Sequence, residues 1–403
     1  MTIASRRNST LAILLFITAL IGILLAGSGF LVLALLAGLA VGEADMQMAG
    51  LALWTGAGMA AVALALAPAA YWSGRTLFGA TPQVPGHPSP RWLVAIAGYP
   101  IFLALGAGAN AEGVGNVLVA ALALVGTAVL PVLIIVLIVR RLGPATTPIR
   151  SWGHFTVGLT GMPALALTLE AALLLPLLIL LGMYLVSTPD GRELFALLDP
   201  GSSMDSEAAT EFAIRFLQSP LALAGVYGYL ALAIPAIEEL VKTMAVWPFL
   251  RRGLSPAEAF LGGALGGAGY ALFEALFLTQ PGEVWLITTV ARAGATLLHV
   301  FTAALASWGL LEGVRRRRFW VTLAAFAVAI SMHGLWNLMA VTIGISSVPV
   351  DAGIPATLAG LANLAPALLA CLTTASAIGL ITAWRLLNRS QDHRPSQSVR
   401  PPA

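Results

Sequence analysis

Long apolar runs alternate with short polar segments along the 403-residue chain. Each run is long enough to cross the hydrocarbon core of a bilayer, which takes roughly 20 residues of helix. The pattern predicts an all-α fold, a polytopic membrane helix bundle of about ten transmembrane helices. The predicted spans are residues 11–41, 48–72, 92–111, 115–139, 155–187, 221–250, 257–279, 284–311, 319–345 and 354–386.

Charged residues in the loops predict the orientation of these spans. Cytoplasmic loops of membrane proteins carry an excess of Lys and Arg. If the first residues are cytoplasmic, the inner loops hold most basic residues, including Arg140, Arg141 and the run 315–318, while the acidic segment 190–211 is outside. We therefore expect ten spans with both the N-terminus and the C-terminus in the cytoplasm.

The longest loop, residues 188–220, divides the chain into two parts. Residues 1–187 are expected to form a five-span membrane region nearly free of buried charge, to which the sequence assigns no role. Residues 221–387 form a second bundle that holds almost all of the charged residues within spans. Residues 188–220 are expected to be an acidic extracytoplasmic loop, and 388–403 a disordered polar tail.

The composition agrees with a membrane protein and excludes several kinds of covalent link and active site. The chain is 59% hydrophobic and 10% charged, whereas soluble domains carry about 25% charged residues. The one cysteine, Cys371, excludes an intrachain disulfide and any metal site built from several cysteines. No Walker loop, serine nucleophile with its base, or nucleic-acid surface is evident.

Glu238, Glu239 and Lys242 lie in the middle of an apolar span, and Lys242 is the only lysine in the sequence. A charge near the bilayer centre costs on the order of 2.5–3.5 kcal/mol on insertion scales. Lys242 is three and four residues from the two glutamates, a spacing that permits ion pairs on a helix. One hypothesis is that Lys242 keeps the pair ionised or oriented; the plainer alternative is a structural ion pair.

Two histidines on later spans are predicted to lie at the depth of Glu238. Glu238, His299 and His333 are 13, 16 and 15 residues from the inner arginines of their helices. A rise of 1.5 Å per residue puts them about 20, 24 and 22 Å from that side. Asn337 shares a helix face with His333. Nearer the outer surface, Glu274 and Arg292 are expected to form an ion pair between neighbouring spans.

This set of side chains permits two kinds of hydrolytic chemistry. Glu, His and His are acceptable ligands for zinc, which makes bound water a better nucleophile. Alternatively, a glutamate and a histidine activate water directly, while the second histidine and Asn337 donate to the oxyanion. Either route would hydrolyse an acyl bond, most naturally a peptide bond. The structural alternative is that each histidine only makes an interhelical hydrogen bond.

Three further features have structural interpretations. The glycine-rich run 262–269 predicts a surface where another helix packs closely. Ser255 and Glu258 flank Pro256 as a capping box at the start of the next span. Glu170, alone among Leu and Ala, is interpreted as a satisfied contact within the bundle.

Four motifs follow one another in this second bundle: Glu238-Glu239 with Lys242, GYALFE at 269–274, Arg292 through His299, and HGLWN at 333–337. In this order they resemble the PrsW family of membrane proteases, within the wider CAAX-protease and Abi (CPBP) superfamily. The resemblance covers about residues 225–345. Lys242 stands where CAAX-protease relatives often have an arginine one residue later, which favours PrsW.

The resemblance implies an intramembrane metalloprotease site in residues 221–387. Possible zinc ligands are Glu238, His299 and His333, and a metal-free Glu/His mechanism is also open. The implied catalytic residues are Glu238, Glu239, His299, His333 and Asn337, supported by Lys242, Glu274 and Arg292.

The expected function is hydrolysis of peptide bonds in membrane-anchored proteins, such as anti-sigma-type regulators. Alternatives are a CAAX-type protease acting on lipidated or small peptides, and a non-catalytic membrane scaffold or transporter. The expected partners are a membrane-anchored protein or peptide substrate and the lipid bilayer, with no nucleic acid. The expected location is multi-pass in a bacterial plasma membrane.

Overall fold

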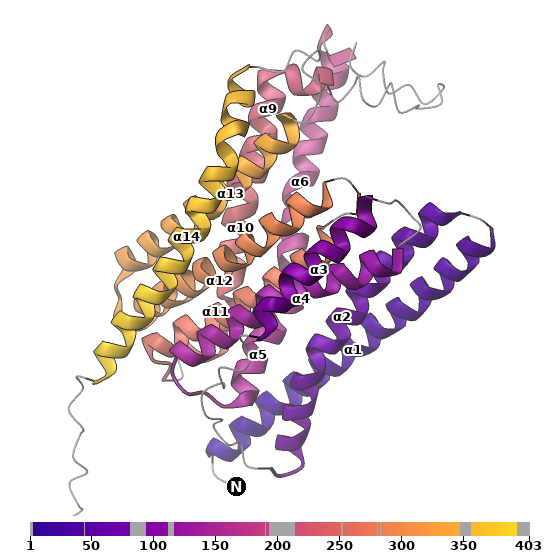
Figure 1. Cartoon of the computed structure of the whole chain (residues 1–403). Helices are drawn as coiled ribbons and strands as arrows, with labels where there is room; N and C mark the ends of the chain where they lie inside the picture. Colours follow the sequence, from indigo (N-terminus) through magenta and orange to yellow (C-terminus); the bar gives the residue numbers. More distant parts are fainter. Residues whose placement is uncertain are drawn as a thin grey trace, which may run out of the picture.

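The computed structural model confirms the all-α fold (Figure 1). All regular secondary structure in the part of the chain that it describes is helical. α1 begins and α14 ends on the same side of the bundle in this view. The described residues are 3–43, 45–80, 94–111, 117–189, 191–192, 214–250, 253–279, 281–282, 284–346 and 356–392.

The leading part of the chain forms six helices among the described residues up to 189. α1 and α2 pack along each other, and α3 packs on α4. α5 and α6 together replace the single predicted span 155–187, because the helix is interrupted at Thr160. The bounds are α1 Ile3–Gly42, α2 Met46–Leu77, α3 Val94–Ala111, α4 Val117–Leu142, α5 Pro148–Leu159 and α6 Gly161–Ser187.

The predicted span 221–250 is also not one continuous α-helix. Pro235 has no backbone N–H, so an α-helical ladder cannot continue through it unchanged. The chain adapts with a π-helical turn directly before this proline and with 3-10 turns afterwards. The segments are α9 Pro220–Tyr227, η3 Gly228–Ala233, α10 Ile234–Lys242, η4 Thr243–Ala245 and η5 Trp247–Phe249.

Four long helices complete the described chain. They are α11 Pro256–Phe277, α12 Trp285–Arg316, α13 Phe319–Ser346 and α14 Ala356–Asp392. Ser255 caps α11: its hydroxyl accepts from the Glu258 N–H at 3.2 Å, and Glu258 Oε2 accepts from the Ser255 N–H at 2.8 Å. The predicted capping box is therefore confirmed.

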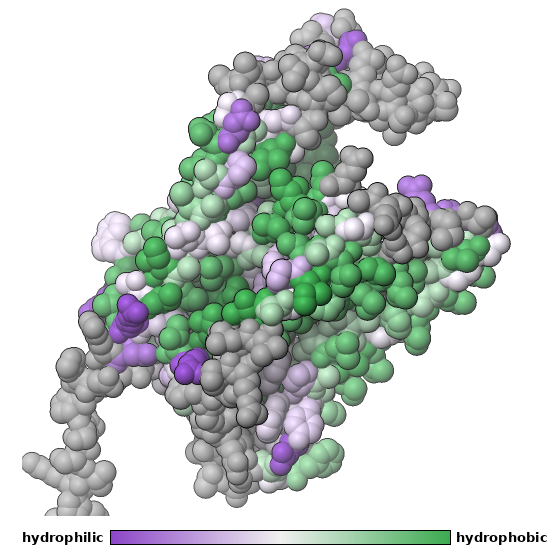
Figure 2. All heavy atoms as spheres, in the orientation of Figure 1, coloured by the Kyte–Doolittle hydropathy of each residue, from purple (hydrophilic) through white to green (hydrophobic). Residues whose placement is uncertain are grey.

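Nine helices in the described part of the chain are long and apolar enough to span a membrane. The remaining predicted span, 92–111, corresponds to α3, whose apolar part Ile96–Ala109 is shorter than a full crossing. Hydrophobic residues cover most of the described surface visible in Figure 2. The described structure is thus a polytopic membrane bundle. Most of the predicted acidic loop and residues 393–403 lie outside the described residues, whereas 388–392 belong to α14.

α11 is the central helix, and nearly all of its residues are buried. A Cβ at Gly267 would collide with the His299 carbonyl oxygen of α12, and one at Gly269 with the Phe155 carbonyl oxygen of α5. Gly158 of α5 similarly leaves no room for a Cβ against α11. The predicted packing role of the glycine run is confirmed, and these contacts join both parts of the chain around α11.

Candidate active site

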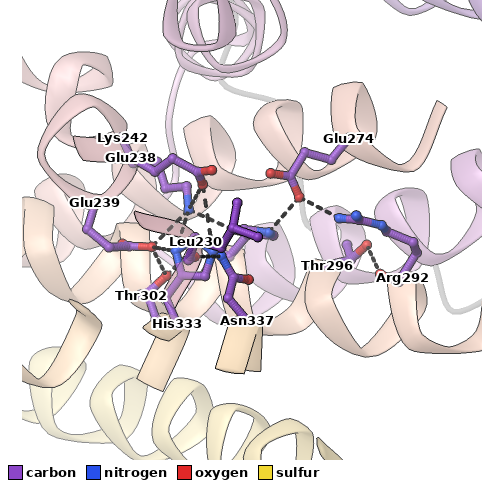
Figure 3. Close-up of polar contacts among 11 residues, drawn as sticks. Leu230, Glu238, Glu239, Lys242, Glu274, Arg292, Thr296, Thr302, His333 and Asn337 are labelled. Atoms are coloured by element: carbon purple, nitrogen blue, oxygen red, sulfur yellow. Dashed lines mark hydrogen bonds and ion pairs between the residues drawn. The ribbon is translucent and has the colours of Figure 1, made fainter. Parts of the chain in front are cut away.

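Four helices bring the sequence-predicted site residues together around a buried polar cluster, with Arg292 and Asn337 partly exposed at its edges (Figure 3). Close packing between α13 and η3 contributes to this arrangement, because a Cβ at Gly334 would collide with the Ala231 carbonyl oxygen. The contributions are Glu238, Glu239 and Lys242 from α10, Glu274 from α11, Arg292 and His299 from α12, and His333 and Asn337 from α13.

Lys242 lies at the centre of the cluster and is completely buried. Its Nζ donates to Glu239 Oε1 at 2.8 Å and forms an ion pair with Glu238 Oε2 at 3.0 Å. The same nitrogen lies 2.7 Å from His299 Nδ1 and 3.4 Å from His333 Nδ1. Lys242 therefore contacts both glutamates, as its helical spacing predicted, and also both histidines.

Glu239 is bound by three donors through one carboxylate oxygen. Besides Lys242, His333 Nδ1 lies 2.9 Å from Oε1, and Thr302 Oγ1 donates to it at 3.1 Å. A carboxylate accepts, so His333 carries its proton on Nδ1 in this arrangement. The other ring nitrogen of His333 then has a lone pair and faces Glu238, with Nε2 3.7 Å from Glu238 Oε2.

A second carboxylate holds His299 from the opposite side. Glu274 Oε2 lies 2.9 Å from His299 Nε2 and 2.9 Å from Arg292 Nη1. The predicted ion pair between Glu274 and Arg292 is confirmed. The depth estimate had placed it nearer the outer surface, whereas Glu274 also contacts the cluster directly. With its proton on Nε2, His299 directs the Nδ1 lone pair toward Lys242.

Glu238 is the least constrained carboxylate of the pair. Its Oε2 takes part in the ion pair with Lys242, but it has no hydrogen bond of good geometry within the described part of the chain. The Tyr270 hydroxyl interacts with the same side chain by a hydrogen bond. Glu238 thus retains an available acceptor oxygen beside both histidines.

Asn337 uses its amide to support the π-helical turn η3. The N–H of Ile234 is donated to Tyr229 in a π-helical bond, and Pro235 has no N–H to donate. The carbonyl oxygen of Leu230 therefore lacks both of its possible backbone donors, and Asn337 Nδ2 donates to it at 3.0 Å. Asn337 lies one turn from His333, as predicted, and this bond anchors η3 to α13.

Sequence reasoning did not assign roles to Tyr270 and Thr302. Tyr270 belongs to the GYALFE motif and lies four residues before Glu274, so both side chains share one face of α11. Thr302 lies three residues after His299 and shares its face of α12 in the same way. A search for polar residues one turn from each predicted site residue would have found both.

Glu170 lies on α6, and its interpretation as a satisfied contact within the bundle is wrong. Its Oε1 is buried and has no hydrogen-bond partner among the described residues. Met162 and Ala166, on the same face of α6, pack in a cluster with Val241 of α10. This face directs Glu170 toward the site, where it interacts electrostatically with Glu238.

The donor atoms fit a metal site in type and arrangement. Glu238, His299 and His333 offer one ligand atom each, all within 4.8 Å of one another. Each histidine also has a carboxylate partner on its other ring nitrogen, the pattern that orients histidine ligands in metalloenzymes. The buried Glu/His/His group is therefore compatible with Zn²⁺, although Lys242 contacts all three residues.

Comparison with known proteins adds one match. A family model described as PrsW family intramembrane metalloprotease matches residues 206–363, less than half of the chain. The matched residues include the candidate site on α10 to α13, whereas Glu170 lies before them. No curated protein and no solved structure matches the chain. The family match confirms the resemblance and supports an intramembrane protease of the metalloprotease type.

Proposed function

Residues 206–363 match the PrsW family model, and from this match we propose that the chain hydrolyses peptide bonds of membrane-anchored proteins. The observation that carries the proposal is the convergence of Glu238, His299 and His333, all buried. Buried ionisable groups at membrane depth are costly and mark functional sites by default. Each histidine has one ring nitrogen close to a ligand atom of Glu238 and of the other histidine. This arrangement supports a hydrolytic role for the histidines better than a purely structural one.

Glu238 is the proposed general base. Its Oε2, which is ion-paired with Lys242 but makes no hydrogen bond within the described residues, can accept a proton from a water molecule that bridges it and His333 Nε2 from one side. The resulting hydroxide adds to the peptide carbonyl, and the carbonyl oxygen becomes an oxyanion. Glu238 then returns the proton to the leaving amine, so that the carboxylate is regenerated.

Positive charge in the cluster stabilises the oxyanion in this proposal. Lys242 is the central cation, and donors directed at a developing charge act strongly in a site that excludes water. Glu239 and Glu274 orient His333 and His299 through the contacts at 2.9 Å. When bound by Glu238, His299 and His333, a metal ion would polarise the carbonyl and increase the acidity of water.

The substrates are proposed to be anti-sigma-type regulators or similar membrane-anchored proteins, in a bacterial plasma membrane. The depth of the site supports cleavage near the outer half of the bilayer, because His333 lies on the continuous helix α13, 15 residues from the inner arginine Arg318, or about 22 Å. The apolar exterior supports a substrate that arrives from the lipid rather than from water.

The test compares new protein N-termini in membranes of cells that produce either the parent or Glu238→Gln. Substrates should show new termini only with the parent, and each should then be cut by purified parent protein in vesicles. A glutamine keeps the size of the side chain but accepts no proton, so cleavage should fall by about 10² or more. Equal cleavage by the variant would contradict Glu238 as the base.

The alternative functions give different results in the same experiment. A CAAX-type protease would cut lipidated or small peptides and leave membrane-anchored proteins intact. A scaffold or transporter would produce no terminus that depends on Glu238. Adding a chelator and then Zn²⁺ to the vesicles separates the two hydrolytic routes. Loss and recovery of cleavage favour the metal, and indifference favours the direct Glu/His route.

A further inference from the structure

The Lys242 ammonium group contacts two of the three candidate ligand atoms, on His299 and Glu238, and lies beside the ring of His333, the third ligand. Its Nζ is 2.7 Å from His299 Nδ1, 3.0 Å from Glu238 Oε2 and 3.4 Å from His333 Nδ1. A second cation bonded to His299 Nδ1 and Glu238 Oε2 would therefore lie close to Nζ. The distances from Nζ to the two histidine nitrogens also exceed the zinc–nitrogen bond length of about 2.0–2.1 Å. The described cluster is therefore arranged around an ammonium group.

Two cations cannot share these ligands. A divalent ion bonded to Glu238 and His299 would lie in direct contact with Nζ, and two like charges at a few ångströms repel strongly in a medium of low dielectric constant. They would also compete for the same lone pairs, since His299 Nδ1 has only one. Metal binding at this point requires Nζ to move away.

The structure provides an acceptor for the displaced ammonium group. Glu239 lies one turn before Lys242, and its Oε2 is buried without a hydrogen-bond partner among the described residues. The ring of Tyr270 lies beside the lysine as well, 4.8 Å from Nζ to the centroid. Cations bind favourably over an aromatic face at this distance. Lys242 can therefore leave the ligands without becoming an unpaired buried charge.

We propose that Lys242 is an internal competitor of the metal ion: its ammonium group occupies the cation position beside Glu238 and His299, two of the three candidate ligands, until a metal displaces it. This inference rests on the proposed use of these three residues as ligands. It assigns Lys242 a positioning role, in which the lysine keeps the metal-free cluster assembled. The same contacts make metal binding weaker than the three ligands alone would permit.

The test measures Zn²⁺ binding to the purified full chain by calorimetry. Lys242→Met keeps the apolar stem and removes the competing charge, so it should bind one Zn²⁺ at least tenfold more tightly than the parent. Adding His333→Ala to this variant should abolish the gain, because one ligand is lost. A lysine that only supports the fold would give the opposite result, namely weaker binding or none in Lys242→Met. That result would overturn the proposal.

Arg292→Met is the matched control for charge. Arg292 is a cation beside the cluster, bonded to Glu274 at 2.9 Å, but within the described part of the chain it makes no ion pair or hydrogen bond with the three ligands. Its removal changes the local charge by the same amount without vacating the central position. It should tighten Zn²⁺ binding by much less than Lys242→Met. An equal effect would mean that any loss of nearby positive charge tightens Zn²⁺ binding, whether or not the ligands are vacated. That result would overturn the proposal.

A second measurement uses the parent protein and does not depend on folding of a variant. Lys242 is the only lysine in the sequence, so amine acetylation followed by peptide mapping reports on this one side chain, apart from the chain's first residue. Zn²⁺ should increase acetylation of Lys242, because Nζ loses its contacts with the ligands. Unchanged or reduced acetylation at saturating Zn²⁺ would overturn displacement.

The binding results are separable from failure of the proposed protease function. If neither the parent nor Lys242→Met binds Zn²⁺, the competition is refuted, while Glu238-dependent cleavage in vesicles still decides the protease question. If both bind Zn²⁺ as expected and no membrane protein is cut, the competition stands and the proposed function fails.

Discussion

His333 presents opposite ring nitrogens to two consecutive glutamates. Its Nδ1 lies 2.9 Å from Glu239 Oε1, and its Nε2 lies 3.7 Å from Glu238 Oε2. Adjacent residues on a helix point in directions about 100° apart, so one imidazole ring can be placed between them. The two carboxylates therefore have different environments, and we expect them to have different functions.

The first prediction separates the two glutamates by stability. Glu239→Gln removes the anion with the most donors around completely buried Lys242. Breaking a buried ion pair by removing one partner costs on the order of 3–5 kcal/mol. We expect Glu239→Gln to lower both the thermal unfolding temperature and the cleavage rate. Glu238→Gln should lower cleavage by about 10² or more but lower the unfolding temperature less than Glu239→Gln does, because Lys242 keeps its hydrogen-bonded partner Glu239.

Thermal unfolding followed by tryptophan fluorescence in detergent provides the measurement. The parent and both variants are compared at equal protein and detergent concentrations. If Glu238→Gln is the destabilised variant and Glu239→Gln unfolds like the parent, the two roles are reversed.

The second prediction concerns Asn337. Asn337→Ala leaves the Leu230 carbonyl without its side-chain donor, at a cost of about 1–3 kcal/mol for an unsatisfied buried group. We expect a lower unfolding temperature and a loss of cleavage of about tenfold, smaller than the 10²–10³ for a removed oxyanion donor. A loss as large as that of Glu238→Gln with unchanged stability would favour direct contact with the oxyanion.

Thr342→Val is the control for Asn337. The Thr342 hydroxyl lies 2.9 Å from the Tyr227 hydroxyl, so it also joins α13 to the preceding helical segment. It does not contact Leu230. Thr342→Val should lower stability modestly and leave the cleavage rate within about twofold of the parent, since a neutral hydrogen bond contributes only about 0.5–1.5 kcal/mol.

The third prediction tests the junction between α5 and α11. Gly158→Ala or Gly269→Ala would force a Cβ into the backbone of the facing helix. Overpacking of this kind costs typically 1–3 kcal/mol, and backbone atoms cannot turn away as side chains do. The unfolding temperature should fall in both variants. Gly108→Ala on α3 has no heavy atom within 4 Å of its new Cβ and should unfold like the parent.

The fourth prediction is the topology, with residues 190–211 outside and 312–318 inside. Single cysteines at positions 205 and 316, in a chain with Cys371→Ala, should react with an impermeant maleimide from opposite sides of the membrane. The expectation rests on the alternation of basic and acidic loops. Labelling of both positions from one side would refute the ten-span arrangement.

Depth along a helix could be predicted from the sequence, whereas rotation about the helix axis could not. A fixed rise per residue was sufficient to match Glu238, His299 and His333 in level. A soluble helix reveals its inner face by an apolar stripe, but a helix in lipid is apolar on all sides. The sequence therefore did not show that Lys242 would point at both histidines.

The π-helical turn before Pro235 could not be predicted from the sequence for a related reason. The stretch around Pro235 reads as one apolar run, and hydropathy does not distinguish an α-helix from a π-helical turn. The bond from Asn337 to Leu230 depends on that turn, so its partner could not be inferred. The ion pair of Glu274 with Arg292 was predicted correctly, but its contact with His299 required the relative placement of α11 and α12.

Glu170 has a consequence for how relatives of this protein are compared. The residue belongs to α6, before the segment that matches the PrsW family model, yet it lies close enough to Glu238 to interact with it electrostatically, and its Oε1 has no hydrogen-bond partner among the described residues. Two homologues with identical motifs on α10 to α13 can therefore differ in the residues of α6 that lie beside the site. Alignments confined to the shared motifs would not detect such a difference, so a comparison of relatives has to include the leading helices.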